Sequence, residues 1–525
     1  GLFSFTKLFV SCCFLLMENE QFLPHHQDCG FFILLTLLSC CCFCFVQCQI
    51  PTSPPPFETH WYNQTLDHFQ FTKKASTLWP QRYLVSTKYF DPNAKQPAIF
   101  FYTGNEGDIE MFWQNTGAIY VLAQQHCGLV VFGEHRYYGQ SLPFGRGSLL
   151  QPEYLSSEQA IADYVKLLLA IKNPLSPNYI EGAENLPVVA LGGSYGGELA
   201  AWIRMKAPNV VIGSLASSAP ILGFPGLSDQ YAYNNIIADD YTQAGGDRCS
   251  SSIRNTFPLL EKLTSTPQGR STIEKAMHLC QPLPSQAKVG YDQLFSWLSN
   301  AFSYTAMTNY PDATSFLQPL PAWPVNVTCN QINDALPSSG SPTDAQLLNA
   351  IRRGVSVYYN STGNESCFNI TQSVSAGLGM GAWDIQACSE QVFEISSGQR
   401  SLFPPQQWNL SNLEKECALI GITTRPNYST RFYQSDAIVA AIKSGQTIDW
   451  MSQIIFSQGA LDPWSGLGVG QDLSPSLYGI MIEHAAHHLD LRFASPNDPP
   501  SVSAARKKEH DIISGWIHDF YQYQE

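Results

Sequence analysis

Short apolar segments alternate with helix-like segments between residues 98 and 217, and this alternation constrains the fold more than any other feature of the sequence. The apolar segments are almost uninterrupted, which is typical of strands buried on both faces of a parallel sheet. The sequence therefore predicts an α/β protein with a mostly parallel sheet and helices on both faces. Strands are expected at 98–102, 128–133, 187–191 and 210–217, and helices at 111–125, 158–172 and from 197 onwards.

The alternation stops near residue 222, and strand-like segments return only at 453–459 and 477–484. The residues between them are rich in prolines, loops and helical patterns. We therefore expect one α/β core interrupted by an insertion. The core would comprise residues 49–222 and 436–525, and residues 223–435 would form a helical, disulfide-rich cap domain. A last helix, near 504–523, would pack on the sheet through one apolar face made of Ile512, Ile513, Trp516, Ile517 and Phe520.

Residues 1–48 differ in composition from the rest of the chain. Residues 30–48 form an uncharged apolar run that ends in small residues, as in a secretory signal peptide with cleavage near Cys48 or Gln49. The apolar part, 31–46, is shorter than the roughly 20 residues that a membrane-spanning helix needs, which favours a signal peptide over an anchor. The first methionine is Met17, so we interpret residues 1–16 as upstream of the translation start.

The remaining cysteines support the secretory route. No Cys-x-x-Cys spacing typical of a zinc site is present beyond residue 48, and Cys127 lies far from the other six. We expect three disulfides among Cys249, Cys280, Cys329, Cys367, Cys388 and Cys417. Glycosylation is expected at sequons that begin at Asn63, Asn326, Asn360, Asn364, Asn369, Asn409 and Asn427. Together these features predict the secretory pathway, ending in a lysosome, a vacuole or the extracellular space.

The net charge of −14 excludes a general binder of nucleic acid or of anionic membranes. Hydrophobic residues make up 44% of the chain and charged residues 14%, which is enough apolar material for a large core. We expect a folded protein without nucleic-acid partners and without stable membrane insertion. The sequence leaves the oligomeric state open, with a homodimer as one possibility.

The pattern Gly192-x-Ser194-x-Gly196 lies where a predicted strand meets a predicted helix. A nucleophile elbow needs this strand-turn-helix context, since the serine occupies a strained turn and the neighbouring glycines remove clashing Cβ atoms. The helix N-terminus would then stabilise a developing oxyanion. We therefore predict that Ser194 is a nucleophile.

A serine nucleophile needs a base and an orienting acid, and in this type of fold both follow the serine in the chain. Asp462 comes soon after the strand at 453–459, and His484, His487 and His488 come after the strand at 477–484. Their placement at two successive strand ends predicts a Ser-Asp-His triad. Spacing alone does not choose among the three histidines.

Two backbone N–H groups should form the oxyanion hole. One is expected from Tyr195, the residue after the nucleophile, and the other from Gly104 or Asn105 in the loop "TGNEG". The polar residues Glu134, His135 and Arg136 also follow a strand, and we interpret them as an ion-paired brace beneath the site: a structural role is favoured over direct catalysis.

The segments "YTGNEGDI", "VVFGEHRYYGQSLPFG", "GGSYGGELAAWIRMKAP", "LDPWSG" and "AHHLDLR" resemble the lysosomal Pro-X carboxypeptidase family of serine peptidases, which includes the dipeptidyl peptidase 2 branch. The resemblance runs from about Leu66 to the C-terminal helix. It implies an α/β-hydrolase core with a helical insertion, cleavage after proline, and Ser194, Asp462 and His487 as the triad. The chain departs from the family in having Ala485 where glycine is usual.

The expected reaction is acyl transfer without cofactor or metal, releasing the last residue of peptides that end in Pro-X. Apolar walls for the proline are expected from the insertion, whose tryptophans include Trp297, Trp323, Trp383 and Trp408. His488 or Arg492 would bind the terminal carboxylate, particularly if His488 is protonated at acidic pH.

Three alternatives remain open at this point. Glu106 is placed to bind a terminal ammonium, as a dipeptidyl peptidase that releases N-terminal X-Pro would require. A lipase or esterase would share the elbow, and an inactive secreted binding protein would need no chemistry at all.

Overall fold

The computed structural model describes residues 50–70, 77–371 and 380–523. The chain divides into two compact units, Gly1–Ile50 and Pro51–Glu525, and all but one of the described residues belong to the second. The signal peptide and upstream segment expected over 1–48 lie outside the described residues. Within these described ranges, no helix combines the length and the apolar character needed to cross a membrane.

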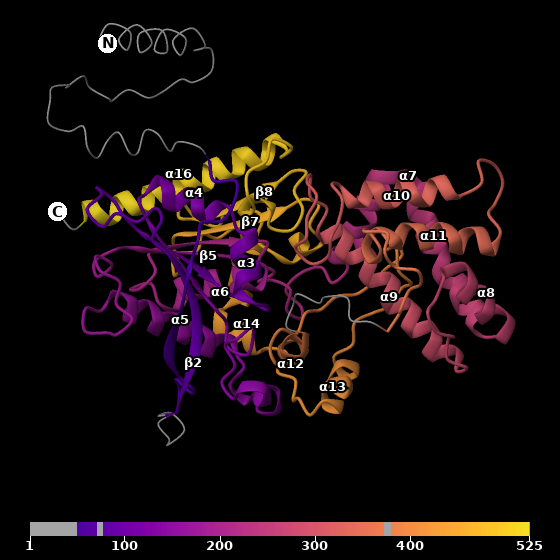
Figure 1. Cartoon of the computed structure of the whole chain (residues 1–525), viewed down its shortest axis with the longest axis horizontal. Helices are drawn as coiled ribbons and strands as arrows, with labels where there is room; N and C mark the ends of the chain where they lie inside the picture. The colour runs from indigo at the N-terminus through magenta and orange to yellow at the C-terminus, as the bar shows by residue number, and fades with distance from the viewer. Residues whose placement is uncertain (1–49, 71–76, 372–379, 524–525) are drawn as a thin grey trace, which may run out of the picture. The chain divides into compact units, whose positions relative to one another are not determined.

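The core is one twisted sheet with the strand order β1-β2-β4-β3-β5-β6-β7-β8 (Figure 1). Strand β2 pairs antiparallel with β1 and β4, and every other neighbouring pair is parallel. The mostly parallel α/β sheet predicted from the sequence is therefore confirmed. The strands are β1 (Glu58–Thr65), β2 (Leu78–Ser86), β3 (Ile99–Thr103), β4 (Leu129–Gly133), β5 (Val188–Gly193), β6 (Gly213–Ser217), β7 (Ile454–Gly459) and β8 (Leu477–Ile482).

Helices cover both faces of the sheet, because side chains on each central strand point alternately to opposite faces. Phe100 and Tyr102 of β3 pack in a buried cluster with α3 (Ile109–Asn115), α4 (Ala118–Gln125) and α16 (Pro500–Gln522). Phe101, between them, packs on the other face with α5 (Ser157–Lys172) and α6 (Tyr195–Lys206). Both faces are apolar, which is why these strands read as uninterrupted apolar runs. Helix α16 buries Ile513, Trp516 and Ile517, as expected.

The helices α7 to α15 lie between β6 and β7 in the chain (Figure 1). Residues of the first five contribute to a separate apolar core, distinct from the two clusters that contain the β3 side chains. This architecture is an α/β-hydrolase fold with a helical insertion. The helices are α7 (Ala232–Thr264), α8 (Pro267–Met277), α9 (Ala287–Met307), α10 (Pro324–Ala335), α11 (Asp344–Tyr359), α12 (Met380–Ser389), α13 (Leu410–Leu419), α14 (Tyr428–Tyr433) and α15 (Ser435–Ser444).

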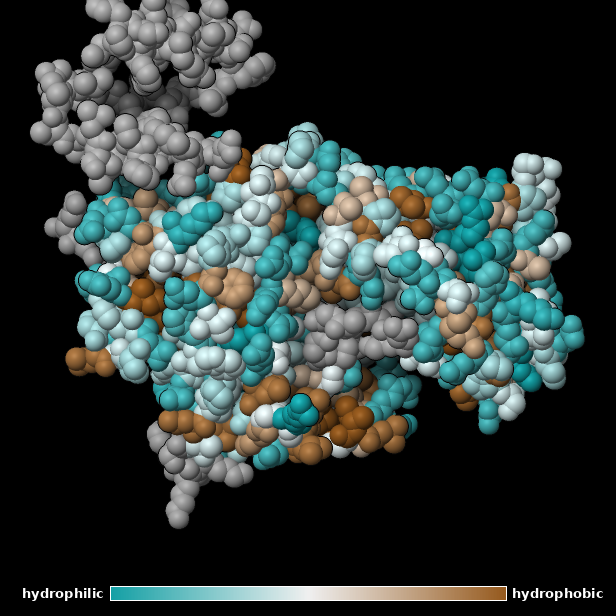
Figure 2. Space-filling model, in the orientation of Figure 1, coloured by the Kyte–Doolittle hydropathy of each residue, from teal (hydrophilic) through white to brown (hydrophobic). Residues whose placement is uncertain are grey.

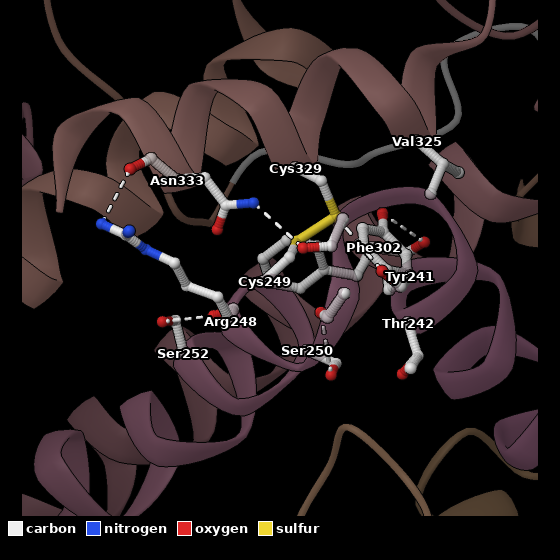
Figure 3. The surroundings of a disulfide bond; sticks show 12 residues. Tyr241, Thr242, Arg248, Cys249, Ser250, Ser252, Phe302, Val325, Cys329 and Asn333 are labelled. Atoms are coloured by element: carbon white, nitrogen blue, oxygen red, sulfur yellow. Dashed lines mark hydrogen bonds between the residues drawn. A yellow bond between two sulfur atoms is a disulfide. The ribbon is translucent and has the colours of Figure 1, made fainter. Parts of the chain in front are cut away.

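Three disulfides, Cys249–Cys329, Cys280–Cys367 and Cys388–Cys417, use the six cysteines named from the sequence, and Cys127 joins none of them. Figure 3 shows the first, which links α7 to α10. Beside it, Asn333 Nδ2 donates a hydrogen bond to the Gly245 carbonyl at 3.0 Å. Helix α7 is broken here, because Gly246 adopts φ 68°.

The surface in view is mostly polar, with apolar residues gathered around α12 and α13 (Figure 2). Leu419 and Ile420, at the end of α13, are 87% and 55% exposed. Six of the seven sequon asparagines are exposed, and Asn360 is half-buried. Its side chain exchanges hydrogen bonds with the backbone of Glu365, so glycosylation there would disturb this contact.

Three sequence-based expectations differ from the structure. The helix expected at 111–125 is two helices, α3 and α4, because the chain turns at Gly117, where an added Cβ would lie 2.3 Å from Phe493 Cα. Strand β6 begins at Gly213 rather than at residue 210. Strands β1 and β2 were not predicted, and they form the antiparallel edge of the sheet.

Candidate active site

Ser194 lies in the tight turn between β5 and α6, with φ 60° and ψ −129°. Such angles are unfavourable for a non-glycine residue and occur at nucleophile elbows. The turn is so close that a Cβ on Gly192 would lie 2.0 Å from the carbonyl oxygen of Gly196. The Ser194 N–H donates to the Ser217 carbonyl of β6 at 2.9 Å. The strand-turn-helix context expected for this serine is therefore present.

Asp462 and His487 form a buried hydrogen-bonded pair. Asp462 lies three residues after the end of β7 and precedes a 3-10 turn (Pro463–Leu467), and His487 lies in the loop after β8. His487 Nδ1 donates to Asp462 Oδ2 at 2.7 Å, and the Trp464 N–H donates to Asp462 Oδ1 at 3.0 Å. The exposed fractions are 0% for Asp462 and 2% for His487. The carboxylate thus holds the imidazole in the tautomer that leaves Nε2 as an acceptor.

Ser194 and His487 line the same cavity, whose volume is about 300 Å³. Its apolar lining comes both from the core and from the insertion, since Met307 ends α9 and Trp383 belongs to α12. No Arg or Lys is among the described residues that line it. The apolar wall is made of Met307, Phe316, Leu317, Trp383, Phe393 and Trp464.

The structure separates the two candidates for the second oxyanion donor. Tyr195, the first candidate donor, starts α6 and lines the cavity. Asn105 lines the cavity as well, whereas Gly104 does not, and the Gly104 N–H already donates to the Gly133 carbonyl at 3.0 Å. An N–H engaged in this way is unavailable to a substrate oxygen, which leaves Asn105 as the better placed residue.

Glu106 reaches the cavity and is only 9% exposed. Asn105 Nδ2 donates to Glu106 Oε2 at 2.8 Å. Burial raises the pKa of the Glu106 carboxyl, and the hydrogen bond from Asn105 and the charge of His487 oppose this only partly. Burial also raises the pKa of Asp384, the other carboxyl in the lining. At acidic pH the Glu106 carboxyl therefore tends toward its neutral form.

Of the two residues expected to bind the terminal carboxylate, His488 lines the cavity and Arg492 does not. Burial and the charges of His487 and Arg492 lower the pKa of His488 well below its usual range, so the expected protonated His488 is disfavoured. Arg492 is absent from the cavity lining; its Nη2 donates to Asn115 and Thr314, each at 3.0 Å. Its guanidinium also lies 4.3 Å from the centre of the Tyr310 ring.

The ion-paired brace expected beneath the site is present. Arg82 Nη2 lies 2.6 Å from Glu134 Oε1, and Arg136 Nη2 lies 2.6 Å from Asp163 Oδ1. His135 differs from the other two, because its Nε2 is 3.0 Å from the hydroxyl of Tyr195. Of these buried groups, His135 is the one that contacts the residue next to Ser194.

Sequence reasoning missed most of the cavity wall. Of the four tryptophans considered, Trp383 lines the cavity, whereas Trp297 is buried in the core of the insertion. Trp464 was overlooked, although its position two residues after Asp462 could have indicated it. Among the described residues, no group of three or more His, Cys, Asp or Glu side chains is placed to hold a metal ion.

Comparisons with known proteins agree with this site. The family model for serine carboxypeptidase S28 matches residues 64–509. Lysosomal Pro-X carboxypeptidases of Homo sapiens and Pongo abelii are each 40% identical over 480 residues, which cover 90% of this chain and 91% of theirs. The thymus-specific serine protease of Mus musculus is 26% identical over 486 residues, which cover 88% of both chains. The chain therefore belongs to the serine carboxypeptidase S28 family.

Proposed function

We propose that this protein is a serine exopeptidase that cleaves after proline and releases the C-terminal residue of peptides ending in Pro-X. The observation that carries the proposal is the buried His487–Asp462 pair, 2.7 Å apart, whose histidine lines the same apolar cavity as the strained Ser194. Membership of the serine carboxypeptidase S28 family and the names of the relatives support the same activity.

The proposed chemistry is acyl transfer. His487 Nε2 takes the proton of the Ser194 hydroxyl as the serine oxygen attacks the carbonyl carbon of proline. The N–H groups of Tyr195 and Asn105 stabilise the resulting oxyanion, and the imidazolium of His487 is stabilised by Asp462. The leaving amine takes the proton from His487. A water molecule, activated by the same histidine, then hydrolyses the acyl-enzyme and frees Ser194.

The apolar wall suits a proline side chain at the cleavage position. The proline ring is rigid and has no backbone N–H, so it can enter an apolar cavity without leaving a donor unpaired. Trp383 and Trp464, from α12 and from the turn after Asp462, supply flat apolar surfaces for it.

The substrate's terminal carboxylate must be bound without a lysine or arginine, since the described part of the cavity lining holds neither. We propose that the neutral form of Glu106 donates a hydrogen bond to this carboxylate. The raised pKa of Glu106 supports a protonated side chain in an acidic compartment. On this proposal, the binding of Pro-X peptides weakens as rising pH ionises Glu106.

A dipeptidyl peptidase remains the second candidate, because Glu106 and Asp384 give the cavity two carboxyl groups that could bind an N-terminal ammonium. Two substrates separate the candidates: a peptide with a blocked N-terminus that ends in Pro-Phe, and an amide reporter with a free N-terminal X-Pro dipeptide. The carboxypeptidase proposal expects release of phenylalanine from the first. Cleavage of the X-Pro reporter alone would contradict the carboxypeptidase proposal and identify a dipeptidyl peptidase.

We also propose that residues 223–435 act as a cap domain on a core formed by 49–222 and 436–525. The position of α7 to α14 between β6 and β7 supports these bounds, and α15 packs with residues of β6 and β7 as part of the core. Three disulfides and the lysosomal relatives support the secretory pathway, with the lysosome or vacuole as the site of action. The physiological partners would be peptides with proline at the cleavage position.

A further inference from the structure

Two consecutive serines at the end of β6, Ser217 and Ser218, contact the backbone of both the nucleophile and the histidine loop. The Ser217 carbonyl accepts the Ser194 N–H at 2.9 Å. The Ser218 hydroxyl accepts the N–H of His488 at 2.8 Å. One dipeptide therefore contacts the serine turn on one side and the residue next to the proposed base on the other.

Asp490 completes the connection. This residue is 2% exposed and lies three positions after His487. Its Oδ1 accepts from the Ser217 hydroxyl and its Oδ2 from the Ser457 hydroxyl of β7, each at 2.7 Å. Both carboxylate oxygens are thus used to hold the histidine loop against two adjacent strands.

Two side chains of α16 lie against Asp490. Glu509 of α16 packs beside it, and burial and the Asp490 charge raise the pKa of Glu509 well above its usual range. Arg506, from the same helix, donates from Nε to the Asp490 carbonyl at 2.8 Å and from Nη2 to the Leu489 carbonyl at 2.7 Å. The loop after β8 that carries His487 is therefore bonded both to strands β6 and β7 and to helix α16.

The backbone at Ser218 supports a functional constraint. Its φ is 49°, a left-handed value that is unfavourable for serine, and its N–H donates to the Ser457 carbonyl at 2.7 Å. Strained residues of this kind persist where several contacts determine them together, and they concentrate at functional sites.

We propose that Ser217, Ser218 and Asp490 are positioning residues, which we call the serine clip, and that they set the distance and angle between Ser194 and His487. The inference rests on the proposed Ser-His-Asp chemistry. Proton transfer requires the serine oxygen and the imidazole nitrogen to lie within hydrogen-bond reach, and a misplacement of about 1 Å can cost about 100-fold in rate. None of the three residues lines the cavity, so none is expected to contact the substrate.

The test removes the hydrogen bonds of Asp490 from each side in turn. The double variant Ser217→Ala/Ser457→Ala keeps the Asp490 side chain and removes both hydroxyl donors to it. Asp490→Ala removes the acceptor, and Asp490→Asn restores an oxygen and an NH2 group that can pair with both hydroxyls. The matched control is Ser214→Ala, because Ser214 is buried in the same strand and its hydroxyl has no hydrogen-bond partner among the described residues.

The readouts are kcat and KM for a Pro-Phe peptide, the rate of Ser194 labelling by a fluorophosphonate, and the melting temperature. We expect the double variant and Asp490→Ala to lower kcat and the labelling rate about 10- to 100-fold, with KM changed less than about threefold. Asp490→Asn should recover about tenfold of that loss, and Ser214→Ala should match the wild type.

Three results would overturn the serine clip. One is a folded double variant with wild-type kcat and labelling rate, another is a loss confined to KM, and the third is an Asp490→Asn variant no better than Asp490→Ala. If the wild type cleaves no Pro-X peptide, the proposed function fails, while fluorophosphonate labelling still reports the geometry between Ser194 and His487.

Discussion

Replacing Glu106 by glutamine tests how the terminal carboxylate is recognised. Glu106 is 9% exposed in the cavity, and burial raises its pKa. Glutamine keeps the shape of the neutral acid, presents an NH2 donor at every pH, and cannot ionise. It can still accept the hydrogen bond that Asn105 gives at 2.8 Å. The variant therefore imitates the protonated wild type across the whole pH range.

The size of the effect follows from one hydrogen bond to a charged group. Such a bond contributes about 1.5–3 kcal/mol, which corresponds to roughly 10- to 150-fold in KM. Because the pKa of Glu106 is raised, its carboxyl carries a proton at acidic pH and loses it as pH rises through the pKa of Glu106 in the folded protein. The wild-type KM for Pro-X peptides should then rise by about this factor, whereas the KM of Glu106→Gln should stay low and nearly constant.

The assay is steady-state cleavage of an N-terminally blocked Pro-Phe peptide across pH 4.5 to 7.5. Glu158→Gln is the matched control, since Glu158 is also 9% exposed with a pKa raised by burial but lies outside the cavity lining. Its KM should keep the wild-type pH dependence. Loss of Pro-Phe cleavage in Glu106→Gln, or an unchanged pH dependence of its KM, would refute the proposed role. Loss of X-Pro reporter cleavage instead would favour the dipeptidyl peptidase.

Further tests concern Asp462, Glu390 and the Cys249–Cys329 disulfide. Asp462→Asn should lower kcat about 10⁴-fold with little change in KM, because an amide favours the wrong tautomer of His487. A stopped assay over hours measures the residual kcat, and a loss of less than tenfold would contradict this role of Asp462. Burial raises the pKa of Glu390 from 4.5 to about 7. The stability that the protonated Glu390 side chain contributes is therefore complete below pH 4.5 and is lost as pH rises to 7. In Glu390→Gln, the free energy of unfolding in urea should fall by about 3 kcal/mol less over this pH range than in the wild type; the same pH dependence in both proteins would refute the raised pKa. Replacing both Cys249 and Cys329, which lie 80 residues apart, by serine should lower the free energy of unfolding by about 4–5 kcal/mol, because the unfolded chain gains entropy. Urea unfolding measures this loss, and an unchanged midpoint would show that the disulfide does not stabilise the fold.

Much of the core and the triad follows from local patterns. The central strands read as apolar runs because both faces are covered, and Ser194, Asp462 and His487 each lie within five residues of the end of a strand. The six cysteines and the helical insertion were also predictable, because composition changes sharply after residue 222. Here sequence and structure agree because the determining contacts are close in the chain.

Strand β2, the cavity wall and the contacts of Arg492 depend on residues that lie far apart in the chain. Strand β2 was missed because it buries Gln81 and Arg82, which interrupt its apolar pattern and are paired with Gln64 and Glu134. The cavity wall was missed for the same reason. Leu317 lies 123 residues after Ser194 (317 − 194) and lines the cavity only because this part of the insertion packs against the core of the sheet. Likewise, nothing local indicates that the guanidinium of Arg492 is engaged elsewhere.

The most direct test of the proposed function is product analysis by mass spectrometry. The protein and its Ser194→Ala variant are incubated with a Pro-Phe peptide at acidic pH, alongside fluorophosphonate labelling. We expect that the wild type releases free phenylalanine and is labelled at Ser194, and that the variant does neither. Phenylalanine release by Ser194→Ala, or release of only an N-terminal X-Pro dipeptide by the wild type, would contradict it.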